Sequence, residues 1–161
     1  MNLPDPSAAK VADRHALYRE LVLEHARAPR NFGLLPHATH RAEGINPLCG
    51  DKLELSLLID ADSRISQAGF IGTGCAISLA SASILTELIA GLTISEACAL
   101  FGDFQITLDC QDDNAMPAIA EPLRALAGVR RFPSRIKCAT LAWHAMANAV
   151  HERDADVVTT E

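Results

Sequence analysis

Five cysteines stand in this chain of 161 residues, at positions 49, 75, 98, 110 and 138. In a reducing compartment, cysteines serve as metal ligands or catalytic nucleophiles more often than as a disulfide framework. Their number is odd, their spacings are wide, and no two of them form a C-x-x-C pair. They are therefore candidate metal ligands or catalytic groups, and the alternative is that some are small buried apolar side chains.

Three of these thiols fall at predicted junctions between elements. Cys49 and Asp51 stand two residues apart just before a predicted strand, so that a thiolate and a carboxylate can point into one space. Cys75 follows Gly74 at the start of a predicted helix, where unpaired N–H groups favour a thiolate. Cys138 lies in the opening turns of the last predicted helix. Three sulfurs and one carboxylate oxygen would complete a tetrahedral zinc site, although spacing alone leaves a metal site and inert thiols equally open.

The other cysteines and the histidines show no ligand pattern. Cys98 lies among apolar residues and is predicted to pack against them. Cys110 lies in an acidic stretch that offers it no base or cation. His25 and His144 fall on predicted helices and are interpreted as structural residues. A metal-free thiol enzyme that uses a Cys–His pair is the alternative from another functional class.

The elements that must position these groups follow from the apolar pattern. Residues 52–59 alternate apolar and polar side chains, which predicts a half-buried strand, and 60–63 has turn chemistry. Residues 64–72 then return as a second strand, with Gly69 a possible bulge, and 41–45 add a third. The strands form an antiparallel meander rather than βαβ units.

Helices are predicted on both sides of these strands. One leads from Asp13 to about residue 28, and after the strands a second covers the run from Cys75 to Gly91. Thr93-Ile-Ser-Glu96 is a capping box that starts a third, a short helix covers 122–127, and a final one covers 133–151. One leading helix, then strands, then helices indicate an α+β fold.

Composition limits the organisation and the partners. We expect one domain at 13–151, a flexible N-terminal arm at 1–12 and a polar C-terminal tail at 152–161. With 14 Lys and Arg against 20 Asp and Glu, the net charge is −6, which disfavours nucleic acid as a partner. No signal peptide is recognised, and polar residues interrupt the most apolar stretch, 75–92, so no membrane partner and a cytoplasmic location are expected.

Three motifs resemble those of the U-type iron–sulfur cluster assembly proteins, and they occur here in the family's order. They are Asn46-Pro-Leu-Cys-Gly-Asp51, Gly72-Thr-Gly-Cys-Ala-Ile-Ser78 and Arg135-Ile-Lys-Cys-Ala-Thr-Leu-Ala-Trp143. The similarity covers roughly residues 15–150. It implies a small antiparallel three-stranded sheet packed against a helical bundle, as in the IscU and SufU branches of the family.

Within this family the chain resembles the SufU branch more than the IscU branch. The IscU branch carries a histidine directly before its third cysteine, where this chain has Lys137. Arg131-Phe-Pro-Ser-Arg135 occupies the region of the chaperone-binding Leu-Pro-Pro-Val-Lys motif, and the stretch between Cys75 and Cys138 is longer than in the IscU branch. Without that histidine, Asp51 is left to complete the ligand set, which suits zinc better than a transferable cluster.

The resemblance implies a zinc-dependent sulfur acceptor that works with a pyridoxal-phosphate cysteine desulfurase of the SufS type. Cys49 would receive the persulfide sulfur, so the expected activity is that of a sulfurtransferase. Cys49, Asp51, Cys75 and Cys138 would hold Zn²⁺, and the sulfur would pass on to a downstream iron–sulfur assembly scaffold. In the family, a desulfurase side chain is thought to replace the departing cysteine on the metal. Arg135 is the candidate cation beside this anionic ligand set.

The alternative within the family is a scaffold that builds a labile iron–sulfur cluster and hands it on. The cofactor would then be the cluster rather than Zn²⁺. Lys137, in the place of a cluster-ligating histidine, argues against it.

Overall fold

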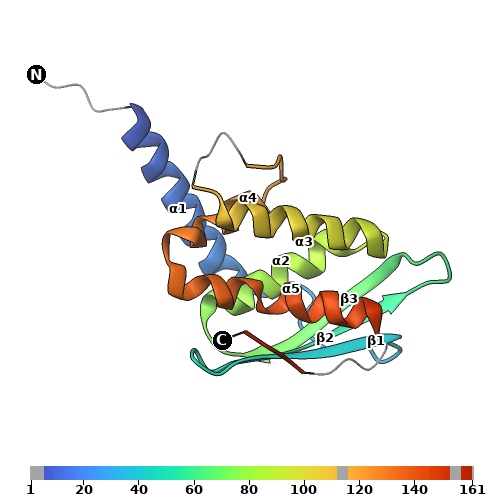
Figure 1. Cartoon of the computed structure of the whole chain (residues 1–161). Coiled ribbons are helices and arrows are strands. Elements are labelled where there is room, and N and C mark those ends of the chain that lie inside the picture. The colour runs from blue at the N-terminus through green and yellow to red at the C-terminus, as the bar shows by residue number, and fades with distance from the viewer. Residues whose placement is uncertain (1–5, 112–115, 153–156, 161) are drawn as a thin grey trace, which may run out of the picture.

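The computed structural model describes residues 6–111, 116–152 and 157–160 (Figure 1). A long leading helix, α1, is followed by a three-stranded hairpin sheet and then by the remaining helices, α2 to α5. The elements in chain order are α1 (Pro6–Arg27), β1 (His40–Asn46), β2 (Asp51–Ile59), β3 (Ile65–Thr73), α2 (Ala76–Ile89), α3 (Ile94–Asp109), α4 (Leu123–Leu126), η2 (Ala127–Arg131), η3 (Pro133–Arg135), α5 (Ile136–His151) and β4 (Val158–Thr159).

The sheet is the predicted antiparallel meander with a short extra strand at its edge. Its order is β3-β2-β1-β4, with β1, β2 and β3 antiparallel and β4 parallel to β1. All three predicted strands are confirmed within a residue or two of their ends. The tail predicted at 152–161 thus contributes a strand at 158–159, where Thr160 N–H also donates to the Ile45 carbonyl.

The predicted bulge at Gly69 is wrong. The register shift between β2 and β3 lies at Leu58 and Ile59 instead. Gly69 is required for another reason: the segment that follows α1 runs alongside β3 here, with Phe32 in a parallel bridge to Phe70, and a Cβ at Gly69 would lie 2.5 Å from the Gly33 carbonyl oxygen. The glycine allows two backbones to approach closely.

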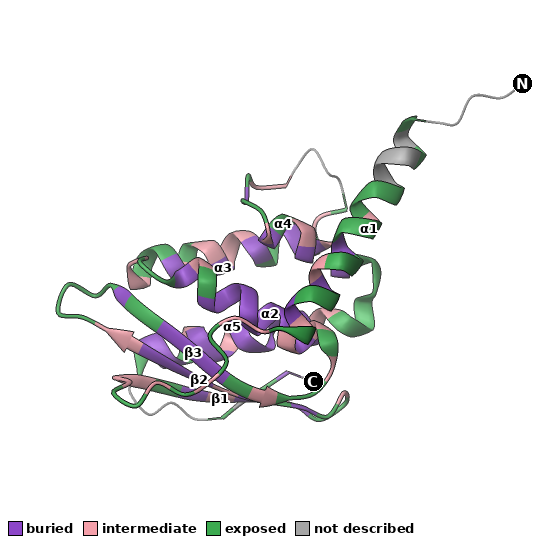
Figure 2. Ribbon diagram, turned by 180° about the vertical axis from the view of Figure 1, so that it is seen from behind, coloured by how far each residue is buried: buried purple, intermediate pink, exposed green. Residues whose placement is uncertain are grey.

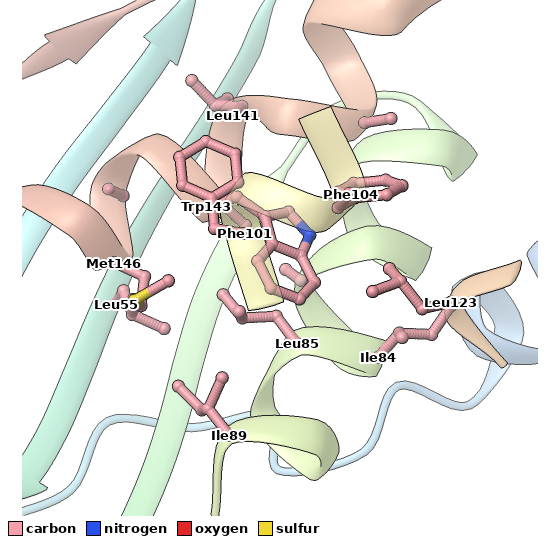
Figure 3. Packing of buried hydrophobic residues seen from close by; sticks show 14 of the residues in the cluster. Leu55, Ile84, Leu85, Ile89, Phe101, Phe104, Leu123, Leu141, Trp143 and Met146 are labelled. Atoms are coloured by element: carbon pink, nitrogen blue, oxygen red, sulfur yellow. The ribbon is translucent and has the colours of Figure 1, made fainter. Parts of the chain in front are cut away.

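The helices cover one face of the sheet and enclose the core between the two layers (Figure 2). Trp143 of α5 is fully buried at the centre of this core (Figure 3). The ring centroids of Phe101 and Phe104, both from α3, lie 5.9 and 5.3 Å from that of Trp143. The indole N–H donates to Ser81 Oγ of α2 over 3.1 Å, so the buried polar atom of the tryptophan is satisfied.

Helix boundaries follow local signals at some ends and not at others. α3 begins with the predicted capping box, in which Thr93 and Glu96 each accept the other's backbone N–H. The leading helix, by contrast, begins at Pro6 and not at the predicted Asp13, so residues 6–12 are helical. Pro is favoured in a first helical turn, where its missing N–H is no loss. Among the described residues, no helix is both long and apolar enough to cross a bilayer.

Candidate metal centre

Three segments that are far apart in the sequence meet at one end of the sheet. The loop between β1 and β2 carries Cys49, and Asp51 begins β2. Because β3 pairs with β2 so that Thr73 faces Lys52, the β3–α2 junction with Cys75 lies beside Asp51. The N-terminal turn of α5, which packs on β1 and β2, supplies Cys138. The sheet register and the α5 docking together bring the predicted ligands to one place.

The side chains of Cys49, Asp51 and Cys138 form a compact group. Their ligand atoms all lie within 4.8 Å of one another, and the two sulfurs are 3.2 Å apart. Within the described part of the chain, this is the one group of three or more His, Cys, Asp or Glu side chains so close together. Cys75 is not within that limit of all three, but its sulfur lies 3.7 Å from Asp51 Oδ2. The structure therefore gathers all four predicted ligands around one space, three of them tightly.

Asp51 and Cys75 are tied together at the start of α2. Asp51 is 1% exposed, and its Oδ1 accepts the Cys75 N–H over 2.7 Å. Cys75 is the N-cap of α2, and its sulfur accepts the Ser78 N–H over 3.4 Å. A helix N-terminus favours negative charge, so both groups lie where anions are stabilised.

Gly74 makes this contact possible. Its φ is +146°, and a Cβ there would lie 2.8 Å from the Asp51 Cα and would overlap the Asp51 carboxylate. Only glycine lets the β3–α2 junction lie this close to the base of β2.

Cys138 of α5 is fully buried, whereas Cys49 and Cys75 are partly exposed. Burial, followed by hydrogen bonds to Cys49 and Asp51, raises the pKa of the Cys138 thiol well above its ordinary value. Burial therefore disfavours the thiolate form of Cys138.

Asn46 is a neighbour of the cluster that the sequence motif contained but that was not predicted as a site residue. It is 1% exposed, and its Nδ2 donates to Cys138 Sγ over 3.5 Å. Its Oδ1 is buried and has no hydrogen-bond partner among the described residues. A bound ion, or a water molecule bound to it, would supply the partner that this buried oxygen lacks. The signal in the sequence was an asparagine directly after the predicted strand 41–45 and three residues before a candidate ligand.

The donor set fits zinc. Three sulfurs and one carboxylate oxygen, with no imidazole, match the ligands that tetrahedral Zn²⁺ accepts in proteins. The fit rests on the chemistry of the donors and on the orphaned Asn46 oxygen beside them.

Arg135 lies at the exposed rim of the cluster. Its Nη1 is 3.8 Å from Cys49 Sγ, and the neighbouring thiols, Cys138 first, raise the pKa of the guanidinium. Arg135 therefore lies where the predicted cation was expected, beside the thiols, and its role in balancing the charge of the ligands stays a prediction. The Lys137 side chain is exposed.

The residues predicted to lie outside the site do so. Cys98 packs against the core, and burial raises its thiol pKa. Cys110 caps the end of α3. Burial lowers the pKa of His25, which contacts Ser83 Oγ, and of His144, whose ring packs edge-on against Phe101.

Comparison with known proteins agrees with the motifs. Residues 17–158 match the NifU-like N-terminal domain family. The chain belongs to this family. The resemblance to U-type assembly proteins is thereby confirmed, and the α+β fold with a three-stranded antiparallel sheet and helices agrees with that of solved relatives.

Two similar curated proteins represent both branches of the NifU-like family. The zinc-dependent sulfurtransferase SufU of Bacillus subtilis is 36% identical over 143 residues, which cover 89% of this chain and 95% of that protein. The iron–sulfur cluster assembly scaffold protein IscU of Streptococcus pyogenes is 38% identical over 148 residues, 88% and 91% of the two chains.

A solved structure extends the likeness to three dimensions. A candidate iron–sulfur cluster assembly scaffold protein for the SUF system from Fervidobacterium islandicum superimposes with a TM-score of 0.74 at 30% identity, covering 84% of this chain and 98% of that one. The NifU-like domain of Brucella abortus, at 22% identity and a TM-score of 0.73, shares the fold.

Proposed function

We propose that this NifU-like domain acts in iron–sulfur cluster assembly as a zinc-dependent sulfur acceptor. The observation that carries the proposal is the group of Cys49, Asp51, Cys75 and Cys138, in which a buried carboxylate completes the ligand set. In addition, Lys137 stands where an iron–sulfur cluster would need a histidine ligand. The similarity to SufU and to IscU supports the wider role in assembly.

The proposed ligands of Zn²⁺ are these same four side chains. When bound, the ion holds thiols as thiolates at neutral pH, against the effect of burial at Cys138. Asp51 has a second task, because its Oδ1 also holds the Cys75 N–H and so fixes the start of α2 beside the cluster.

Cys49 is the sulfur that reacts. It is partly exposed on a loop whose neighbouring Leu48 is 77% exposed, whereas Cys138 is fully buried and Cys75 is held in the N-cap of α2. Burial excludes Cys138 and the N-cap hydrogen bond holds Cys75, which is also partly exposed, so Cys49 on its loop is the thiol proposed to attack a partner's persulfide.

The transfer is a thiol–persulfide exchange. The Cys49 thiolate attacks the terminal sulfur of the donor persulfide, a new S–S bond forms at Cys49 Sγ, and the donor's own S–S bond breaks. The donor cysteine leaves as a thiolate with the electron pair of that bond, so no external oxidant or reductant is needed. Arg135 Nη1 lies 3.8 Å from Cys49 Sγ, so its guanidinium can hydrogen-bond to the attacking thiolate, whose negative charge passes to the departing donor sulfur.

The donor in this proposal is a pyridoxal-phosphate cysteine desulfurase of the SufS type, and the acceptor is a downstream assembly scaffold. The activity is accordingly that of a sulfurtransferase acting in the cytoplasm. The likeness to SufU over most of both chains supports this choice of partner.

Transfer of labelled sulfur tests the assignment of Cys49. The protein is incubated with a cysteine desulfurase and ³⁵S-cysteine, and the protein-bound label is located by peptide mass spectrometry. We expect label on Cys49 in the wild type, loss of the label in Cys49→Ala, and normal labelling in the matched control Cys98→Ala. Undiminished labelling of Cys49→Ala would show that another group accepts the sulfur.

The scaffold function is the second candidate, supported by the 38% identity to IscU. Anaerobic reconstitution with iron and sulfide separates the two. A scaffold yields a coloured cluster that transfers to an apo-protein, whereas the zinc-dependent acceptor retains its zinc and stays colourless.

A further inference from the structure

A cavity of about 190 Å³ lies between α1 and the segment formed by α4 and η2. Among the residues that the structure describes, its charged lining consists of Arg14, Arg124, Arg130 and Arg131 and one acidic residue, Glu121. The rest of the wall is mainly apolar. This arginine cavity is a concentrated positive site on a chain whose net charge is −6.

Two of the four guanidinium groups are available to a ligand. Arg124 and Arg131 are exposed and have neither an ion pair nor a hydrogen bond within the described ranges. Arg14 and Arg130 have partners inside the protein. Unpaired arginines around an apolar cavity suit a carboxylate, which arginine binds with two parallel hydrogen bonds.

Aromatic rings beside the arginine cavity contact the chain segment that leads to the metal centre. Tyr18 lines the cavity and is 6% exposed, and its ring lies 6.2 Å from Phe132 and 6.4 Å from His15. Phe132 directly follows Arg131 of the cavity rim and stands three residues before Arg135, whose Nη1 contacts Cys49. The η2–η3 turn therefore carries the cavity residue Arg131 and, four residues later, Arg135 at the rim of the thiol cluster.

The ionisation of Tyr18 supports this closeness. Burial raises the pKa of its phenol most, the thiols of Cys75 and Cys138 raise it further, and Arg135 lowers it. The arginine cavity, which Tyr18 lines, therefore lies on the side of the molecule that carries Cys75, Cys138 and Arg135.

The size and surroundings of the cavity indicate the kind of occupant. Sites for small-molecule ligands measure about 300–1,000 Å³, so a cavity of about 190 Å³ suits one or two side chains of a larger partner. Exposed apolar side chains accompany the arginines: Leu17, in the cavity wall, is 54% exposed, and Phe132, next to Arg131, is 39% exposed. Positive charge with apolar surroundings is the complement of an acidic segment on a protein surface.

We propose that the arginine cavity is a docking site for an acidic segment of the protein that donates sulfur to Cys49. This inference rests on the proposed function and adds the surface by which the donor is held. Arg124 and Arg131 bind carboxylates of the segment, and the η2–η3 turn sets the distance from that contact to Cys49.

Charge reversal at the two available arginines tests the proposal. Arg124→Glu/Arg131→Glu is compared with the matched double variant Arg27→Glu/Arg41→Glu, which makes the same charge change at exposed arginines outside the cavity. Binding to a persulfide-loaded cysteine desulfurase is measured by calorimetry at two salt concentrations. In parallel, Cys49 is loaded from inorganic polysulfide, which needs no docking surface, and the zinc content is determined.

We expect the cavity variant to raise the Kd for the desulfurase about ten-fold and to weaken its salt dependence. Its zinc content and its loading from polysulfide should equal those of the wild type. The control variant should bind the desulfurase within about two-fold of the wild type. A hexaglutamate peptide should compete with the desulfurase for the wild type and not for the cavity variant.

Two results would overturn the docking site alone. One is equal desulfurase affinity for the cavity variant and the control while both accept sulfur. The other is competition by citrate for the cavity with no effect of the substitutions on desulfurase affinity, which would make it a small-anion site. Failure of the wild type to accept sulfur from both the desulfurase and polysulfide would instead contradict the proposed function itself.

Discussion

Asn46 and Gly74 show how residues that bind no metal shape this cluster. Asn46 directs its amide N–H at Cys138 Sγ, and Gly74 leaves the space that the Asp51 carboxylate occupies. Neighbours of this kind orient the ligands and tune their charge.

Replacing Asn46 should weaken the metal site while leaving the fold intact. In Asn46→Ala, Cys138 loses its amide hydrogen bond, and loss of such a partner typically costs about 10- to 100-fold in metal affinity. Competition with a zinc chelator measures the affinity, and the spectrum of the cobalt-substituted protein reports on thiolate ligation. Wild-type affinity with an unchanged cobalt spectrum would show that Asn46 has no part in the site.

Two glycine-to-alanine substitutions should have opposite effects. Gly74→Ala places a methyl group against Asp51 at a φ of +146°, so we expect lower zinc affinity and a loss of at least about 1 kcal/mol of unfolding free energy. Gly102→Ala lies in α3 with open space around the new Cβ, and we expect a gain of about 0.5–1 kcal/mol. Urea unfolding checks both values. Equal effects of the two substitutions would contradict the close approach at Gly74.

At the scale of elements, the end of α1 is fastened to α2 by buried polar groups. His25 Nδ1 lies 2.7 Å from Ser83 Oγ, which also accepts the Arg30 N–H over 2.8 Å. Burial, with a smaller contribution from Arg30, lowers the pKa of His25. A neutral ring therefore suits this contact, because the charge of a protonated, buried ring would be offset only in part by the carboxylates of Glu87 and Glu24.

The pKa of His25 predicts how stability depends on pH. The unfolded histidine has a pKa of about 6.5, and the folded one titrates below it, so the stabilisation is complete above about pH 6.5 and is lost as the pH falls through the folded pKa. We expect the urea midpoint to fall between pH 7.5 and pH 5.5, and His25→Gln to reduce that fall. His37→Gln, in an exposed loop, is the control and should leave it unchanged. An identical pH dependence in all three proteins would exclude His25 as a cause.

The elements also show what the sequence could and could not predict. Strands were predicted because alternation along 52–59 is a local signal, and the capping box at Thr93 and Glu96 is local as well. The role of Gly69 was missed because it depends on a segment about 36 residues earlier in the chain that runs alongside β3. The meeting of Cys49, Cys75 and Cys138 depends on strand register and on α5 docking, which spacing alone does not encode. The family motifs, and not the spacing, made it predictable.

For the whole molecule, the core and the metal centre are separate sources of stability. The buried hydrophobic cluster runs continuously through the sheet and helices around Trp143 (Figure 3). The proposed ligands lie at one end of the sheet and join the β1–β2 loop, the start of α2 and the start of α5. The ion would therefore tie segments together that the core already holds.

Removal of metal should accordingly lower stability without unfolding the protein. At free zinc about 1,000-fold above Kd, binding to the folded state contributes about 4 kcal/mol. We expect a chelator to lower the Tm, while the far-ultraviolet circular dichroism at 25 °C stays that of a folded α+β protein. Complete loss of helical signal on chelation would mean that the metal, and not the core, organises the fold.

The central claim is that three cysteines and one aspartate share a single zinc ion, and metal analysis of the purified protein tests it most directly. We predict about one zinc per chain in the wild type, loss of most of it in Cys138→Ser, and full retention in Cys98→Ser, whose sulfur lies outside the cluster. A wild type without zinc, or a Cys138→Ser variant that keeps its full zinc content, would contradict the account.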